Sequence, residues 1–493
     1  MKLIKLIQNE LIKIFKRKSI YILLFLSLVI IVIYNYINPT ENGVINLTNT
    51  RDMSVVSIEK DLKEEKDIEE YVKTKAQYDF VNLYNSFEEN SWQRYALRNE
   101  KVFTTVGNVI TDMDHDIIPT LEIINDFENN ENTAITQEEY NKNKKKFNEY
   151  KEALNENDWR KYVELKINNL QDLINSTNIT EEDKKGIYVD IETYKLRLDN
   201  DVNFGNDIKN EYINMFRSNY YSLISNMKQN EDNYMNKLSI QSSKSNMNIA
   251  KFAIENDINQ YISGYEKIDA RISFIRTFEN FNLIIIIVAI YVSCISITEE
   301  INKGTIKSLL IKPHKRTSVL IAKILANIIT ILIFMIFIII VQYIAGGIIF
   351  GFESYDLPYI SFDYNTDQIF TMNLFSYIIL AGVTKLPMYT IIVLFCTFMG
   401  VINNHTSMNM ILTLIIFIVS DTAIAEWSKF EGILFISRIL ITNNWDFSQY
   451  LFGQISPIKG LTPILSGVIC LLYGILLLYI TIHKFKNKDI VNV

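Results

Sequence analysis

Cysteine, histidine, proline and glycine are scarce in this chain of 493 residues, with 3, 4, 7 and 16 copies respectively. The three cysteines lie in long apolar runs, so the polar stretch 38–280 has none, which excludes a disulfide scaffold. The histidines are scattered, and no His-Glu-x-x-His, Gly-x-Ser-x-Gly or paired aspartates within an apolar run indicate an intramembrane enzyme. A Gly-x-x-x-x-Gly-Lys phosphate loop is also missing, so we expect neither enzyme activity nor a nucleotide site in this chain.

Apolar residues are concentrated in runs of about 18 residues or more, the length that a bilayer core about 30 Å thick requires. The first run could belong to a signal peptide. The residues that follow it, 34–37, are too large for a small-x-small cleavage site, so we expect an uncleaved span. The sequence predicts an all-α membrane protein with six transmembrane helices, at residues 19–37, 281–298, 319–350, 372–402, 407–425 and 461–482.

Charge is distributed unevenly along the chain. Residues 38–280 hold 30 basic and 44 acidic side chains, which excludes the basic face that a nucleic-acid partner needs. Lysine and arginine are enriched instead in residues 1–18, in the loop 299–318 and in the tail 483–493, which favours the cytoplasmic side for all three. We therefore expect both termini inside, residues 38–280 outside, and a multi-pass location in the bacterial cytoplasmic membrane.

The polar stretch 38–280 has the pattern of helices, with apolar side chains at three- and four-residue steps and little β-branched alternation. We expect an extracellular helical bundle or an antiparallel stalk between spans one and two. The expected helical regions are 55–101, 136–175 with a break at Asn155–Asp158, 180–200, 207–240, and 246–280 running without a proline into the second span.

One short acidic segment, Thr111–Asp116, invites a metal hypothesis because its carboxylates alternate as at the start of an EF-hand loop. The pattern then fails, since Ile117 stands where glycine is required and no glutamate occupies the twelfth place. Asp and His are also common in solvated turns. We therefore predict no metal and no cofactor in this chain.

The N-terminal segment Met1–Lys18 is amphipathic and ends in a basic cluster. Such a helix lies along a membrane surface with its lysines near anionic lipid headgroups, although the charges could serve as an orientation signal alone. The residues expected to form this cytoplasmic interfacial helix are Leu3, Ile7, Leu11, Phe15, Lys16, Arg17 and Lys18.

The loop 299–318 contains the signals of a short helix between two spans. Two acidic residues end the preceding span, a glycine permits a turn, a threonine can cap the short helix and a proline terminates it. An apolar face with a basic rim suits docking into a groove on a cytoplasmic partner. The residues concerned are Glu299, Glu300, Gly304, Thr305, Ile306, Leu309, Leu310, Pro313 and Arg316.

This loop resembles that of ABC transporter type-2 permeases through the pattern Glu300-x3-Gly304-Thr305-x3-Leu309-Leu310-x2-Pro313-x2-Arg316-x6-Lys323. The amphipathic N-terminus and the six-span layout also resemble that family, whereas 38–280 has no counterpart in many members. The resemblance implies that the loop couples the chain to a separate ATPase subunit, which binds ATP and Mg²⁺. It also implies a homodimer or a heterodimer with a related permease. Subfamilies with a long insertion at this place are linked to antimicrobial peptide export or resistance.

Lys385 stands near the middle of the fourth apolar run, two residues before Pro387. A charge at bilayer depth costs about 2.5–3.5 kcal/mol on the translocon scale, so it should face a dimer interior or a water-filled cavity. It could lie on a substrate path and bind an anionic group, or it could neutralise Asp421 or Glu426. Alternatively, Pro387 breaks the run and Lys385 reaches the interface there. The following segment 426–460 suits short re-entrant helices or a helix on the surface.

Two classes of function remain open. The first is the permease subunit of an ATP-driven ABC exporter that moves or extracts an amphiphile from the membrane, such as an antimicrobial peptide, an antibiotic or a lipid. The second is a membrane receptor or mechanical transducer whose extracellular domain binds a ligand or partner, because that domain is nearly half of the chain.

Overall fold

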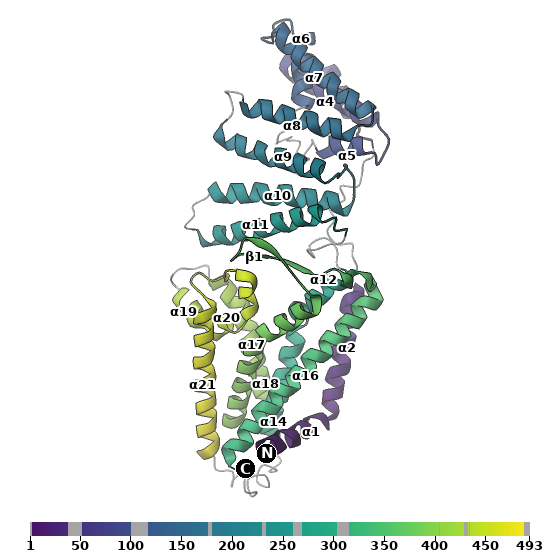
Figure 1. The fold of residues 1–493 in the computed structure, drawn as a ribbon. Coiled ribbons are helices and arrows are strands. Elements are labelled where there is room, and N and C mark those ends of the chain that lie inside the picture. Colours follow the sequence, from purple (N-terminus) through teal and green to yellow (C-terminus); the bar gives the residue numbers. More distant parts are fainter. Residues whose placement is uncertain are drawn as a thin grey trace. The chain divides into compact units, whose positions relative to one another are not determined.

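The computed structural model describes residues 2–37, 52–99, 117–175, 180–228, 233–259, 269–302, 315–403, 405–427, 432 and 434–487. Helices dominate these ranges, and the chain divides into two compact units. The span unit comprises Met1–Gly43 and Tyr261–Val493, and the insert unit comprises Val44–Gln260. We describe each unit by itself (Figure 1).

The span unit contains five helices that are long and apolar enough to cross a membrane, by length and composition. This finding confirms the prediction of a helical membrane protein. The fifth predicted span falls in α18, Thr406–Trp427, of which the described apolar part is Thr406–Phe417. Six spans therefore stay a prediction. The five helices are α2 (Lys18–Ile37), α14 (Asn282–Asn302), α16 (Arg316–Phe350), α17 (Leu374–Ile402) and α21 (Pro463–Asn487).

Helix α14 is the centre of the span unit, since it packs against α16, α17 and α18 and most of its side chains are buried. The outer faces of α2 and α21 are apolar and exposed, the pattern that lipid contact requires. The amphipathic helix α1, Lys2–Phe15, packs mainly on α16. Arg316 Nη1 at the start of α16 donates a 3.0 Å hydrogen bond to the carbonyl of Lys486 at the end of α21. These two helix ends lie at the same end of the unit as α1 (Figure 1).

A β-hairpin between α16 and α17 departs from the all-α prediction. Strands β1 (Tyr359–Asp363) and β2 (Gln368–Met372) pair antiparallel, with Tyr359 opposite Met372. Each strand has five residues, too short a stretch for alternation to be distinguished from a loop. The remaining short elements of the unit are α12 (Ala270–Ile275), α13 (Thr277–Asn280), η1 (Glu353–Asp356), α19 (Leu434–Ile439), α20 (Ile441–Asn444) and η3 (Phe447–Gly453).

The insert unit is a series of helices in which each packs against a neighbour along the chain from α6 to α11, while α4 packs on α6 (Figure 1). Its largest apolar core includes Trp92, Tyr150, Tyr162 and Phe204. The helices are α3 (Val56–Glu64), α4 (Ile68–Asn85), α5 (Trp92–Asn99), α6 (Ile117–Asn129), α7 (Gln137–Asn155), α8 (Trp159–Asn175), α9 (Glu181–Asp199), α10 (Ile208–Lys228) and α11 (Tyr234–Glu255).

Helix ends in the insert unit use Asn and Asp where most proteins use glycine. Asn157, Asp201 and Asp257 have φ of 61°, 54° and 53°, in the left-handed region that closes a helix. After α11 the amide of Ile258 bonds to the carbonyl of Ala253 at 2.9 Å, which completes such a closure. The prediction of one helix over 246–280 is therefore wrong. The predicted helical regions 55–101 and 207–240 are likewise divided, the first into α3, α4 and α5 and the second between α10 and α11.

Candidate functional site

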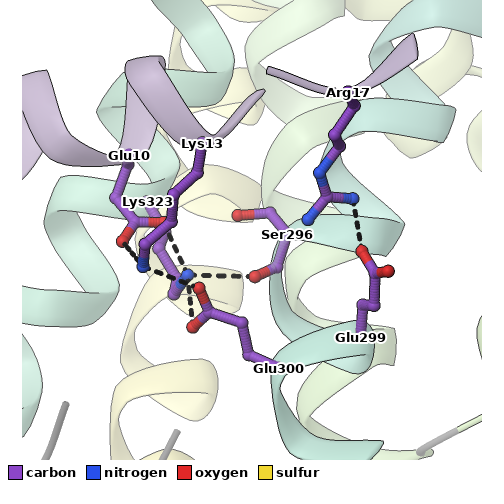
Figure 2. Close-up of polar contacts among 7 residues, drawn as sticks. All are labelled: Glu10, Lys13, Arg17, Ser296, Glu299, Glu300 and Lys323. Carbon is purple, nitrogen blue, oxygen red and sulfur yellow. Dashed lines mark hydrogen bonds and ion pairs between the residues drawn. The ribbon is translucent and has the colours of Figure 1, made fainter. Parts of the chain in front are cut away.

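Four charged side chains from three helices form a closed ring at the α1 end of the span unit (Figure 2). Lys13 Nζ on α1 lies 2.6 Å from Glu10 Oε1 and 2.8 Å from Glu300 Oε1 on α14. Lys323 Nζ on α16 lies 2.7 Å from Glu10 Oε2 and 2.7 Å from Glu300 Oε2. It also donates a 3.0 Å hydrogen bond to the carbonyl of Ser296. Two lysines and two carboxylates therefore alternate, and we call this set the ionic ring.

Burial differs between the two lysines of the ionic ring. The Lys323 side chain is 1% exposed, while that of Lys13 is 41% exposed. An ammonium group has three N–H donors, and the three oxygen partners of Lys323 match that number. A buried cation is tolerated when its charge is paired and its donors are used, so the ring makes it possible for Lys323 to lie inside the helix packing.

The charges of the ring also shift the pKa of Lys13. Burial lowers the pKa of Lys13, but hydrogen bonds and charge attraction from Glu10 and Glu300 outweigh that effect and raise the pKa above 10.5. Lys13 therefore stays charged at neutral pH. Because all four groups neutralise one another, the ring has the chemistry of a structural joint, without a free acid, base or nucleophile.

Helix α1 places Glu10 and Lys13 on neighbouring positions of one face, three residues apart. Beside them the predicted apolar face packs against protein. Ile7, Leu11 and Phe15 contact a cluster that includes Val288 and Phe334. Leu3, Lys16 and Lys18 are exposed, and Arg17 Nη1 pairs with Glu299 Oε2 at 2.6 Å. The helix thus joins α14 and α16 through both charge and apolar contacts.

The predicted coupling loop is described only at its two ends. Glu299 and Glu300 stand near the end of α14, and Arg316 begins α16. The structure joins Glu300 to α1 and α16, and it joins Arg316 to the end of α21. The other predicted residues, Gly304, Thr305, Ile306, Leu309, Leu310 and Pro313, lie outside the described residues.

Lys385 is buried and pairs with Asp446, a residue of the segment between α20 and η3. The side chains of the predicted partners Asp421 and Glu426 lie outside the described residues. Helix α17 continues through Pro387, so the alternative in which the proline breaks the run is wrong. Neighbouring helices support a proline inside a membrane helix by packing around it.

No group of three or more His, Cys, Asp or Glu side chains that could hold a metal occurs among the described residues. The acidic segment 111–116 lies outside them. In the sequence, Lys323 belongs to the loop pattern, whereas Glu10 and Lys13 indicate only the charge balance of the N-terminal segment. The available signal was a carboxylate, Glu10, on the apolar side of an otherwise basic helix, and a lysine inside an apolar run.

Comparisons with known proteins give a family and a relative. Residues 232–491 match the family described as "Protein of unknown function (DUF2705)". The uncharacterized protein YhcI of Bacillus subtilis (strain 168) is 24% identical over 230 residues, which is 45% of this chain and 69% of that protein. No solved structure matches the chain. Because the family match spans more than half of the sequence, including the ionic-ring residues Glu300 and Lys323, this chain belongs to the DUF2705 family of unknown function.

Proposed function

We propose that this chain is the transmembrane permease subunit of an ATP-driven ABC exporter, with energy supplied by a separate ATPase subunit. The observation that carries the proposal is the ionic ring, two of whose residues flank the undescribed part of the loop 299–318. Glu300 precedes residues 303–314 and Lys323 follows them, and both are bound to α1. A partner docked on this loop would therefore move α1, α14 and α16 together.

The ring suits the transmission of force better than chemistry. Ion pairs that are removed from water hold their geometry more firmly than exposed ones, because water no longer competes for the charges. The apolar contacts of Ile7, Leu11 and Phe15 add a second attachment of α1 to the same helices. Such a joint is what a membrane subunit needs when the energy source lies in another polypeptide.

The transported molecule in this proposal is an amphiphile, such as an antimicrobial peptide, an antibiotic or a lipid, exported or extracted from the membrane. ATP and Mg²⁺ would bind the ATPase subunit, and two permease chains, identical or related, would form the path. The exposed apolar faces of α2 and α21 provide surfaces for lipid or for a second permease chain. A role in antimicrobial resistance would follow from such a substrate.

Affinity purification of the tagged chain from its native membrane tests the proposal. An ATPase polypeptide is expected to co-purify, together with ATP hydrolysis. The double variant Leu309→Glu, Leu310→Glu should lose that ATPase, because charge is placed on the predicted apolar face of the loop. The matched control Leu309→Ile, Leu310→Ile keeps the face apolar and should retain it. Purification without any ATPase, or an unchanged yield with the charged pair, contradicts the proposal.

A second candidate function is a receptor or mechanical transducer. The insert unit has its own apolar core and its own compact set of contacts, which a path across the membrane does not require. Replacing residues 44–260 by a short flexible linker separates the two candidates. Transport that survives the replacement assigns a sensing or partner-binding role to the insert unit, whereas loss of transport with intact membrane insertion makes the unit part of the transport path.

A further inference from the structure

The two buried lysines of the candidate spans differ in how many oxygen partners their ammonium groups have. Lys323 has three oxygen partners, as described above. Lys385 is 8% exposed and has one, the Oδ2 atom of Asp446; the described residues provide no other hydrogen-bond acceptor or ion-pair partner for it. Two N–H donors of a buried ammonium are therefore left for a group that is not part of the described chain.

The single partner of Lys385 is held in place and is partly open. Asp446 Oδ1 accepts hydrogen bonds from the amide of Ser448 at 3.0 Å and from its hydroxyl at 2.6 Å. The Asp446 side chain is 31% exposed, so small polar groups reach the ion pair from outside. The next residue along the chain toward α20, Trp445, is buried and lies 4.8 Å from Phe417, measured between ring centroids.

A fixed side chain follows Lys385 by one turn on the same helix. Tyr389, one turn after Lys385 on α17, donates a 2.8 Å hydrogen bond to Asn282 Oδ1 at the start of α14. The helix is continuous through Pro387, so Lys385 cannot leave the site by a break in α17. The ammonium is thus anchored, and the carboxylate facing it belongs to a short segment between α20 and η3.

We propose that Lys385 binds an oxyanion, the phosphate or carboxylate of an amphiphile, in exchange for the Asp446 carboxylate. The exchange replaces one anion by another, so the buried ammonium never stands without a counter-ion, whose loss would be costly at this depth. A phosphate offers several acceptor oxygens to the two unused donors, which a single Asp446 oxygen does not. Release of Asp446 also breaks the ion pair that joins its segment to α17. This inference rests on the proposed transport function for treating the amphiphile as cargo.

Trp445 provides a reporter beside the site. The variant Trp92→Phe, Trp159→Phe, Trp427→Phe leaves Trp445 as the single tryptophan of the full-length chain in detergent. We expect its emission to change with saturation as short-chain phosphatidylglycerol is added, and to stay constant with diacylglycerol of the same chain length, which has no phosphate. Inorganic phosphate forms a third arm. A response to phosphatidylglycerol alone assigns the oxyanion to a lipid-like molecule, and a response to phosphate as well assigns it to soluble anions too.

Two substitutions in this background give opposite results if anions compete for Lys385. Lys385→Met should abolish the response, and Asp446→Asn should tighten binding at least threefold, because it removes the competing carboxylate. An ion pair with only a structural role predicts no response in any arm, or equal losses in both variants, and either result overturns the proposal. The exposed Lys459→Met is the matched control and should leave binding unchanged. Each variant must elute as a single species before titration, and the neutral Lys385→Gln replaces Lys385→Met where it does not.

The binding measurement uses the purified chain without an ATPase, so its failure is distinct from failure of the proposed function. If an ATPase co-purifies but Trp445 emission responds to neither phosphatidylglycerol nor phosphate, the oxyanion site is contradicted and the permease function is supported. If the emission responds but no ATPase co-purifies, the oxyanion site is supported and the exporter function is contradicted.

Discussion

Lys323 on α16 and Glu10 on α1 lie 313 positions apart in the sequence, and their Nζ and Oε2 atoms are 2.7 Å apart in the fold. Both side chains are almost fully buried. Removing one partner of a buried ion pair leaves the other charge without compensation, which costs far more than the pair itself contributes. This asymmetry makes the ionic ring testable by single substitutions.

The first prediction concerns the two lysines of the ring. Lys323→Met should lower the free energy of unfolding by about 3–5 kcal/mol, because Glu10 and Glu300 lose their buried cation. Lys13→Met is the control, since its side chain is 41% exposed and its loss should cost about 1 kcal/mol or less. Thermal unfolding of the detergent-purified chain measures both. Equal destabilisation by the two variants would contradict a ring centred on Lys323.

The second prediction tests whether Glu10 and Lys323 act as a pair. Glu10→Lys and Lys323→Glu should each destabilise the chain strongly, since each places like charges within the ring. The double variant restores opposite charges across α1 and α16, and it should be more stable than the sum of the single effects by about 1–3 kcal/mol. A double-mutant cycle of unfolding midpoints measures the difference. Strict additivity would show that α1 is held by its apolar contacts alone.

Part of this architecture could be predicted from sequence. Apolar runs gave five helices of spanning length because the bilayer requirement acts locally on consecutive residues. The ionic ring could not be assembled in the same way. Lys13 and Glu300 lie 287 positions apart, and only the packing register of α1, α14 and α16 brings them together. A charge in an apolar stripe shows that a partner is needed, without showing which one.

Helix ends in the insert unit mark a second limit. The break at Asn155–Asp158 was expected, and α7 ends at Asn155. The end of α11 at Glu255 was not, because neither proline nor glycine stands there. Asn and Asp adopt positive φ more readily than other residues with a Cβ, and this chain uses them where glycine is scarce. Because Asn and Asp are abundant in both the helices and the loops of this chain, their presence alone does not predict a helix end.

The third prediction concerns a buried polar cluster in the span unit. Gln342 on α16 exchanges hydrogen bonds with Asn35 on α2, at 2.9 and 3.1 Å, and donates one of 2.6 Å to Ser273. Gln342→Leu leaves these buried groups with fewer partners and should cost about 1–2 kcal/mol. The double variant with Asn35→Leu should recover part of the loss. Thr330→Val is the control, because the buried hydroxyl donates to a carbonyl of its own helix, and its effect on thermal unfolding should be smaller.

The fourth prediction concerns acid sensitivity in the insert unit. The hydrogen bond from Tyr140 is the largest effect on Glu128 and, helped by Lys144, holds its pKa below 4.5. A carboxyl whose pKa is lower in the folded state contributes stability above about pH 4.5 and loses that contribution as the pH falls further. Glu128→Gln should therefore lower stability at pH 6 and reduce its fall on acidification. Circular dichroism between pH 6 and 3 measures the effect. Glu131→Gln, an exposed carboxyl just after α6, is the control and should leave the slope unchanged.

The last prediction concerns the backbone at Asp257. Its φ of 53° closes α11, and its exposed carboxylate pairs with Lys209. Asp257→Gly removes the steric cost of that backbone conformation together with a weak surface pair, so stability should change by no more than about 0.5 kcal/mol. Asp257→Val removes the same pair but adds a β-branched side chain, and it should cost about 1–2 kcal/mol. The free energies of unfolding of the two variants, measured in parallel, separate the effect of the lost ion pair from the effect of the backbone conformation. If both lose the same stability, the ion pair rather than the left-handed backbone determines the role of this position.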